Sequence, residues 1–156
     1  MIDQKKIDYF EKHGVICLRG YFTEWVDKLR DGIEKLMRNP SPRERSYTPK
    51  DGTAPFFQDL CNWQRIEEFK DFIYKSDAGK ISSQLMKSKS SRFFHDHVLV
   101  KEPGSSIITP WHQDQSYYCT SGLQTISFWI PLDKVSINNT LNCISGSHKW
   151  NKLHKP

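Results

Sequence analysis

The first third of the chain places apolar residues at helical spacing among charged ones. Across residues 4–13 apolar side chains recur three apart between charges, which predicts a short helix that ends at Gly14. From Thr23, a candidate N-cap, apolar residues step by three and four, with acidic residues early and basic residues late. This pattern predicts an amphipathic helix that ends before the Pro/Gly/Ser-rich segment 39–55, which we expect to be a long loop.

Shorter elements are predicted on either side of that loop. The run VICLRG, residues 15–20, has the apolar and β-branched composition of a buried strand. Beyond the loop, apolar spacing predicts one helix around residues 66–73 and another around 81–85. Ser76 and Asp77 are the candidate caps between these two helices.

The pattern changes from helix to strand at Arg92. The segment RFFHDHVLVKEPG, residues 92–104, is rich in β-branched and aromatic residues and ends in Pro-Gly. The segment LQTISFWIPL, residues 123–132, alternates in part and is also rich in strand formers. We therefore expect the first half of the chain to be mostly helical and the second half mostly strand.

Length and charge narrow the class of protein. A chain of 156 residues is sized for one domain, and its 13% aromatic residues supply apolar area for a core. The net charge is +5 at pH 7, but basic and acidic residues alternate over most of the chain. The basic runs at 87–92 and 148–155 are typical of solvated surfaces, so nucleic-acid binding has the least support.

Cysteine spacing and hydropathy argue against other classes. The four cysteines are far apart and include no C-x-x-C pair, which disfavours a zinc site or a disulfide framework. The N-terminal residues lack the apolar core of a signal peptide, and no stretch approaches the ~20 apolar residues that cross a bilayer. We therefore expect a cytoplasmic protein with no membrane partner.

The segment TPWHQDQSYY, residues 109–118, holds the most distinctive chemistry. In an extended segment, residues two apart project to the same face, so His112 and Asp114 would converge on one point. Oxygenases that use Fe(II) hold the metal with two histidines and one carboxylate on one face of the ion. The alternative is a loop histidine that bonds to a nearby carboxylate, and His-x-Asp spacing alone does not separate the two.

Several ordered motifs together resemble one protein family. They are WHQDQSYY, then ISFWIPLD and GSHKW, with FHDHVLVKEPG upstream. Their order is similar to that in the phytanoyl-CoA dioxygenase family of Fe(II)- and 2-oxoglutarate-dependent oxygenases. The resemblance implies an α+β fold in which N-terminal helices pack on a double-stranded β-helix, a jelly-roll or cupin-like core. It also implies Fe(II) and 2-oxoglutarate as cofactors, with ascorbate as an accessory reductant.

The resemblance assigns roles to individual residues. His112 and Asp114 match the first two iron ligands of the family, and the retained carboxylate implies hydroxylation of a small organic substrate by O2. Gln113 lies within the same motif, and Trp129 matches the tryptophan that lines the 2-oxoglutarate pocket. His97 falls at a pocket position where the family commonly has methionine, so its identity departs from the pattern.

No residue is recognisable as the third iron ligand or as the arginine that binds 2-oxoglutarate. In the family the GSH turn, which contains His148, is structural, and His154 has no strand pattern around it. The 42 residues after Asp114 have room for about three or four strands. We therefore expect one incomplete domain over 1–156, helical over 1–91 and the start of the β core over 92–156.

A truncated core would leave the chain inactive alone and would expose strand edges that favour self-association. A second hypothesis is a non-catalytic module that binds a small carboxylate without iron, and a third is a nucleic-acid binder that depends on Lys87, Lys89 and Arg92. Nothing in the sequence names the substrate.

Overall fold

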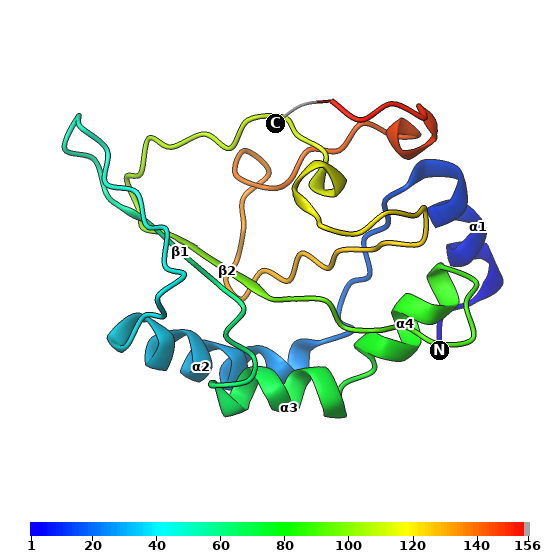
Figure 1. The fold of residues 1–156 in the computed structure, drawn as a ribbon, viewed down its shortest axis with the longest axis horizontal. Coiled ribbons are helices and arrows are strands. Elements are labelled where there is room, and N and C mark those ends of the chain that lie inside the picture. The colour runs from blue at the N-terminus through cyan, green and yellow to red at the C-terminus, as the bar shows by residue number, and fades with distance from the viewer. Residues whose placement is uncertain (155–156) are drawn as a thin grey trace. The chain divides into compact units, whose positions relative to one another are not determined.

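The computed structural model describes residues 1–154 and has helices, short 3-10 turns and one small sheet (Figure 1). It divides into two compact units. The first unit contains Met1–Tyr21, Asp77–Ser91 and the residues from Pro110 onward, and the second contains Phe22–Ser76 and Arg92–Thr109. The elements are α1 (Gln4–His13), η1 (Thr23–Trp25), α2 (Val26–Arg38), β1 (Phe56–Leu60), α3 (Glu67–Lys75), α4 (Ala78–Leu85), β2 (His97–Lys101), η2 (Asp114–Tyr117) and η3 (Ser147–Lys149).

Helix α1 of the first unit begins and ends where the sequence predicts. The Asp3 carboxylate accepts a hydrogen bond from the Lys6 backbone N–H at 2.9 Å, as an N-cap does. Gly14 adopts the left-handed conformation with φ 73° and donates its N–H to the Phe10 carbonyl at 2.7 Å. Both bonds satisfy backbone groups that a helix end would otherwise leave unpaired.

Helices α1 and α4 pack together in the first unit. Ile2, Ile81 and Leu85 are its buried apolar side chains among the described residues. The Ile2 N–H donates to the Gln84 side chain at 3.1 Å, which ties the N-terminus to α4. An ion pair between Lys87 and Glu11 at 2.6 Å adds a bridge at the surface.

The Gly-Ser-His turn closes against the C-terminal end of α1. The Gly146 N–H donates to the His13 carbonyl at 2.9 Å, and His148 Nε2 donates to the Glu11 carbonyl at 3.0 Å. The His148 ring lies so close to Gly14 that a Cβ there would be 2.3 Å from Nδ1. His148 therefore caps a helix, which agrees with the structural role expected for this turn.

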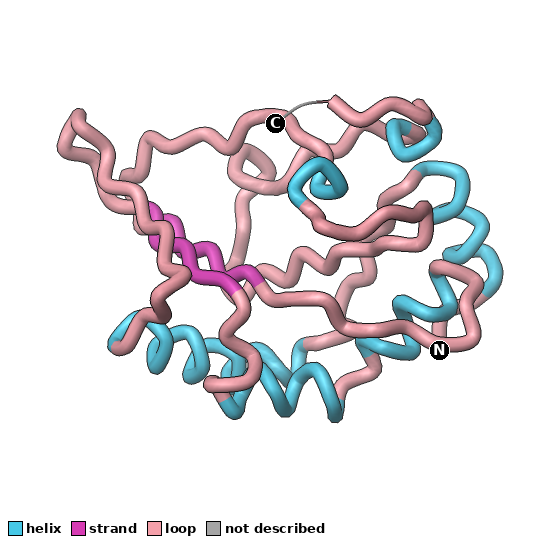
Figure 2. Tube along the Cα trace, viewed as in Figure 1, coloured by secondary structure: helices cyan, strands magenta, loops and turns pink. Residues whose placement is uncertain are grey.

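The second unit is built on a two-stranded antiparallel sheet (Figure 2). Strands β1 and β2 pair from Phe56 opposite Lys101 to Leu60 opposite His97. Phe56 and Val98 turn into the core, where the other buried apolar side chains come from the helices and from the residue before α3. These other core residues are Leu29, Leu36, Ile66 and Phe69.

Helices α2 and α3 lie side by side in the second unit (Figure 1). Gly32 of α2 allows the close approach, because a Cβ there would be 2.7 Å from Cε1 of the buried Phe69 ring. Ion pairs of Lys28 with Asp71 and of Lys35 with Glu68 join the same two helices. The Lys35 hydrogen bond lowers the pKa of Glu68, so this carboxyl remains ionised at neutral pH.

A fully buried carboxylate, Asp59, fastens the loop 39–55 to β1. Its Oδ2 accepts the Ser41 N–H at 2.7 Å, and its Oδ1 accepts the Ser41 hydroxyl at 2.5 Å and the Leu60 N–H at 2.8 Å. Burial alone would raise the pKa of Asp59, but these bonds and one from the Asn62 side chain outweigh it and lower that pKa.

The end of β1 is held by a second carboxylate. Both oxygens of Asp96 accept the Asn62 N–H, at 2.9 and 3.0 Å, and one also accepts the Trp63 N–H at 2.9 Å. Cys61 between the strand and this turn has a left-handed φ of 57°, and its N–H donates to the Asp96 carbonyl. The chain can thus reverse from β1 into α3 without losing backbone hydrogen bonds.

Three predictions about elements were wrong. Residues 15–20 and 123–132 are not strands, because no strand of the described chain pairs with either and a ladder needs a partner. Thr23 is not an N-cap; it begins the turn η1, and α2 starts at Val26. Strand β1 was not predicted, because its second buried residue is the polar Asp59. The expectation that the second half of the chain is mostly strand was therefore also wrong, because that half is mostly loop (Figure 2).

Other predictions are confirmed. Helices α1, α3 and α4 form at the expected places, and the segment 92–104 contains β2. Helices combined with a small antiparallel sheet make the described chain α+β. The double-stranded β-helix and the division of the domain into 1–91 and 92–156 remain predictions. Within residues 1–154, no helix is both long enough and apolar enough to cross a membrane.

Substitution of two helical glycines tests the packing of the second unit. Gly32→Ala should lower the free energy of unfolding by roughly 1 kcal/mol, because the clash with Phe69 exceeds the gain in helix propensity. Gly79→Ala in α4 is the matched control, since its Cβ would meet only the Ser91 hydroxyl at 3.8 Å. It should raise that free energy by up to about 1 kcal/mol in urea denaturation. Equal stabilisation by both would contradict the packing.

Replacement of the buried carboxylate tests the Asp59 network. Asp59→Asn places an N–H₂ where only acceptors fit and should cost about 1–3 kcal/mol of unfolding free energy at pH 7. Because the pKa of Asp59 is lowered from its ordinary 3.8, the stabilisation is present above pH 3.8 and is lost as pH falls through the folded value. The difference from wild type should therefore shrink below pH 3.8.

The exposed Asp31 on α2 supplies the control for this experiment. Asp31→Asn should change the free energy of unfolding by less than about 0.5 kcal/mol both at pH 7 and below pH 3.8. A deficit of Asp59→Asn that stays constant down to pH 2 would show that its ionised form is not what stabilises the fold.

Candidate functional site

His112 and Asp114 lie on the same side of a locally extended segment in the first unit. Gln113 between them has φ −114° and ψ 122°, which is extended backbone, and the turn η2 begins at Asp114. His112 and Asp114 are therefore directed together, with Nε2 3.2 Å from Oδ1. The His112 and Asp114 side chains remain 33% and 50% exposed, so a small ligand can reach both.

The backbone fixes which nitrogen of His112 faces the carboxylate. Nδ1 lies 2.8 Å from the Pro110 carbonyl oxygen, and because a carbonyl only accepts, Nδ1 carries the hydrogen. In the neutral ring, Nε2 then has a lone pair that faces an oxygen of Asp114. This arrangement is favourable only when a cation, either a proton or a metal ion, lies at Nε2.

The second oxygen of Asp114 is held by two hydroxyl groups. Oδ2 accepts from Ser127 Oγ at 2.9 Å and from Tyr118 Oη at 3.3 Å, and these hydroxyls lie 2.9 Å apart. Partial burial raises the pKa of Tyr118, the Ser127 bond opposes this, and the charge of Asp114 raises the pKa further. Tyr118 thus stays protonated at neutral pH and can donate to Asp114.

Gln113 points away from the His112–Asp114 pair and anchors the segment. Its Nε2 donates to the Lys152 carbonyl at 3.0 Å, and its Oε1 accepts the His154 N–H at 2.8 Å. This is the two-bond pattern of a strand ladder, made by one side-chain amide. The Gln113 side chain therefore holds the backbone between His112 and Asp114 in place and does not contact either of them itself.

Gln115 stabilises the loop on the other side of the pair. Its Nε2 donates to the Thr120 carbonyl at 2.6 Å, and its Oε1 accepts the Thr125 hydroxyl at 2.8 Å. Tyr117 packs edge-on against the His112 ring, with centroids 5.8 Å apart. Three consecutive polar residues, 113–115, thus each bond to a different part of the first unit.

The other two predicted site residues, Trp129 and His97, lie in a loop and in β2. Trp129 follows Ser127 by two residues and is 45% exposed, so its ring is accessible. His97 belongs to the second unit, where it is exposed at the first position of β2 opposite Leu60. The structure brings together His112 and Asp114; the cofactor roles of Gln113, Trp129 and His97 remain proposals.

The His112–Asp114 pair fits two ligands of a metal ion. Two neighbouring ligands that are each about 2.1 Å from an octahedral ion lie about 3 Å apart, close to the observed 3.2 Å. The Pro110 carbonyl, Ser127 and Tyr118 orient the two donors, as outer partners do in metal sites. Within residues 1–154 no group of three His, Cys, Asp or Glu side chains could hold a metal.

Ser127 and Tyr118 are not among the site residues predicted from the sequence. Tyr118 follows Asp114 by four residues, a spacing that brings side chains together after one turn, and this could have indicated the contact. Ser127 is the one hydroxyl in the otherwise apolar run ISFWI, a signal for a residue with a polar partner. Neither signal identifies Asp114 as that partner without the fold.

Comparison with known proteins agrees with these features. A sequence model described as Phytanoyl-CoA dioxygenase (PhyH) matches residues 10–156 and so includes the His112–Asp114 pair. Searches of curated proteins and of solved structures give no match. The matched family consists of 2-oxoglutarate-dependent dioxygenases whose members typically use Fe(II). Since this match covers nearly all of the sequence, the chain belongs to the phytanoyl-CoA dioxygenase family.

Proposed function

We propose that this chain carries part of an Fe(II)- and 2-oxoglutarate-dependent oxygenase site that hydroxylates a small organic substrate. The observation that supports this most directly is the pair itself, with His112 Nε2 3.2 Å from Asp114 Oδ1 and Nδ1 held by the Pro110 carbonyl. His112 and Asp114 are then two of the three protein ligands of the iron.

The groups around His112 and Asp114 orient these two metal ligands in the proposed site. When bound, Fe(II) and 2-oxoglutarate supply the activation of O2 and the oxidising power for hydroxylation. The Pro110 carbonyl keeps the Nε2 lone pair of His112 available, and Ser127 and Tyr118 hold the carboxylate of Asp114 in one orientation. The protein thus supplies two metal ligands in a fixed orientation, one of them a carboxylate.

The residues that would receive 2-oxoglutarate are a finer part of the proposal. The exposed ring of Trp129 is suited to line a pocket for the co-substrate, and Gln113 holds the metal-binding segment in place through Lys152 and His154. His97 is proposed as a pocket residue on the family resemblance alone. The third metal ligand and the carboxylate-binding arginine are not assigned.

Exposed apolar side chains support self-association as a further part of the proposal. In the first unit, Trp111, Leu123 and Ile137 are between 69% and 92% exposed. Apolar surface of this kind favours contacts between molecules.

Metal binding by single-site variants tests the proposed function. His112→Ala and Asp114→Ala should each weaken Mn²⁺ binding by more than about tenfold, because loss of a ligand exceeds the loss of an outer partner. Mn²⁺ replaces Fe(II) because it resists oxidation in air, and the free ion is measured by electron paramagnetic resonance. Ser127→Ala removes only a support for Asp114 and should weaken binding by about tenfold.

His154→Ala is the matched control, since His154 bonds to Gln113 through its backbone N–H. It should leave Mn²⁺ binding unchanged. Unchanged Mn²⁺ binding in both His112→Ala and Asp114→Ala would contradict the metal site. If 2-oxoglutarate still bound to those variants, the non-catalytic carboxylate-binding module would be the better account.

A further inference from the structure

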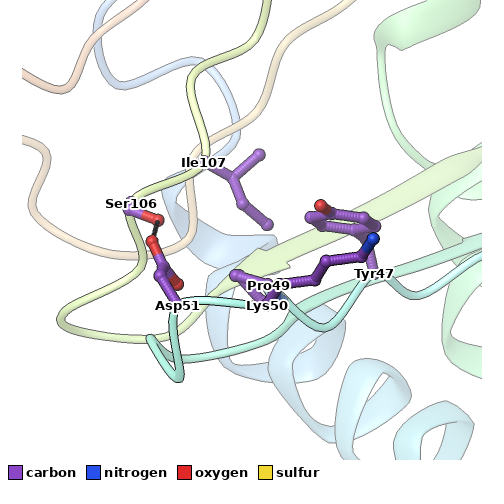
Figure 3. A pocket seen from close by; sticks show the side chains of 6 residues that line it. All are labelled: Tyr47, Pro49, Lys50, Asp51, Ser106 and Ile107. Carbon is purple, nitrogen blue, oxygen red and sulfur yellow. Dashed lines mark hydrogen bonds between the residues drawn. The ribbon is translucent and has the colours of Figure 1, made fainter.

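We propose that a hollow between two loops of the second unit binds a small carboxylate with an apolar body (Figure 3). The hollow uses neither His112 nor Asp114, so this inference stands apart from the proposed oxygenase site. Its volume is about 400 Å³, within the ~300–1,000 Å³ range of small-molecule pockets. Its lining residues are Tyr47, Pro49, Lys50, Asp51, Ser106 and Ile107.

The first wall of the hollow is fixed to the sheet. Tyr47 and Phe56 exchange two backbone hydrogen bonds of 2.9 Å, which extends the pairing of β1 into the loop. Gly52, with φ 76°, provides the turn that brings the loop back towards β1. Tyr47 therefore presents its ring and hydroxyl from a rigid base, although half of the side chain is exposed.

The second wall is fixed by Lys101. Its ammonium group donates to the Ile107 carbonyl at 2.9 Å and to the Thr109 hydroxyl at 3.1 Å, and it lies 4.9 Å from the centre of the Phe56 ring. This ammonium is used to hold the loop, and Ile107 is directed towards Lys50 and Pro49 on the opposite loop (Figure 3). Ile107 provides the apolar surface of the hollow, and the buried Pro49 lies beneath it.

Asp51 joins the two loops and is already satisfied. Its carboxylate accepts the Thr53 N–H at 3.0 Å, the Thr53 hydroxyl at 2.8 Å and the Ser106 hydroxyl at 2.9 Å. These bonds, led by the Thr53 N–H, lower the pKa of Asp51, so it remains a bonded carboxylate at neutral pH. Its acceptor oxygens are thus engaged within the wall.

Lys50 consequently supplies a cation to the hollow that is available to a ligand. Within residues 1–154 no carboxylate forms an ion pair with Lys50, although it lies in the lining beside Asp51. The ammonium of Lys50 and the phenol of Tyr47 can both donate to a carboxylate, and Ile107 offers an apolar contact to the rest of the ligand. The Asp51 carboxylate in the same lining is occupied by its own hydrogen bonds. A phosphate dianion would need more donors than Lys50 and Tyr47 provide.

A titration with hexanoate tests this inference on the full chain without metal. Hexanoate should give saturable shifts of the Tyr47 amide and the Ile107 methyl resonances, with a dissociation constant on the order of 1 mM. Succinate lacks an apolar body and hexan-1-ol lacks a charge, so each should bind at least about fivefold more weakly.

Variants assign the binding to the lining residues. Lys50→Met keeps the apolar stem and should weaken hexanoate binding at least fivefold without changing the weak binding of hexan-1-ol. Lys89→Met, which removes an exposed ammonium outside the hollow, should leave hexanoate binding unchanged. An amide spectrum with wild-type dispersion shows that each variant folds.

Three outcomes would overturn the inference. They are absence of saturable shifts at Tyr47 and Ile107, unchanged hexanoate affinity in Lys50→Met, and inorganic phosphate binding as tightly as hexanoate. None of these results depends on the His112–Asp114 pair, because no metal is added. The proposed oxygenase function can therefore fail or hold independently of this binding site.

Discussion

Backbone groups outside regular secondary structure must find hydrogen-bond partners, and in this chain short polar side chains supply many of them. Asp59 accepts from the backbone of Ser41, and Asp96 accepts from the backbone of Asn62 and Trp63. Gln113 does the same with both a donor and an acceptor on the segment 152–154. Long loops with an unpaired backbone would be costly, so these side chains allow the loops to hold a defined conformation.

The candidate site follows from the same constraint. Asp114 accepts from the side-chain hydroxyls of Ser127 and Tyr118 with one oxygen, where the structural carboxylates accept mainly from backbone N–H groups, and directs the other oxygen towards His112. The His112 Nδ1 hydrogen is likewise taken by a backbone carbonyl, which leaves Nε2 to face Asp114. The site therefore differs from the structural carboxylates in one respect: an acceptor nitrogen and an acceptor oxygen face each other in reach of solvent.

Local sequence pattern predicted the elements whose stabilising interactions are local. Apolar spacing and Gly14 predict helix α1 over its observed bounds, and the Asp3 cap that the structure adds is also local, within three residues of the helix start. The sequence pattern did not predict strand β1, because its second buried position is Asp59, whose hydrogen-bond partner Ser41 lies 18 residues away. The segment 123–132 has the composition of a strand but no paired neighbour in the described chain, and composition cannot supply a partner.

Local contacts of the His112–Asp114 site were likewise predictable from the sequence, and its long-range contacts were not. The two-residue spacing of His112 and Asp114 predicted their convergence, because it depends only on extended backbone at Gln113. The support from Ser127 depends on a contact across 13 residues of loop, which no local pattern encodes. Motif order identified the family, but the roles of Trp129 and His97 depend on long-range geometry and remain proposals.

The orientation of the His112 ring is the most direct test of this account. Long-range proton–nitrogen NMR at pH 8 reports which imidazole nitrogen carries hydrogen, with and without Zn²⁺ as a diamagnetic metal. We predict that Nδ1 carries hydrogen in both samples and that the Nε2 resonance shifts when Zn²⁺ is added. Hydrogen on Nε2, together with no response of that nitrogen to Zn²⁺, would show that His112 and Asp114 form only a hydrogen bond within a loop.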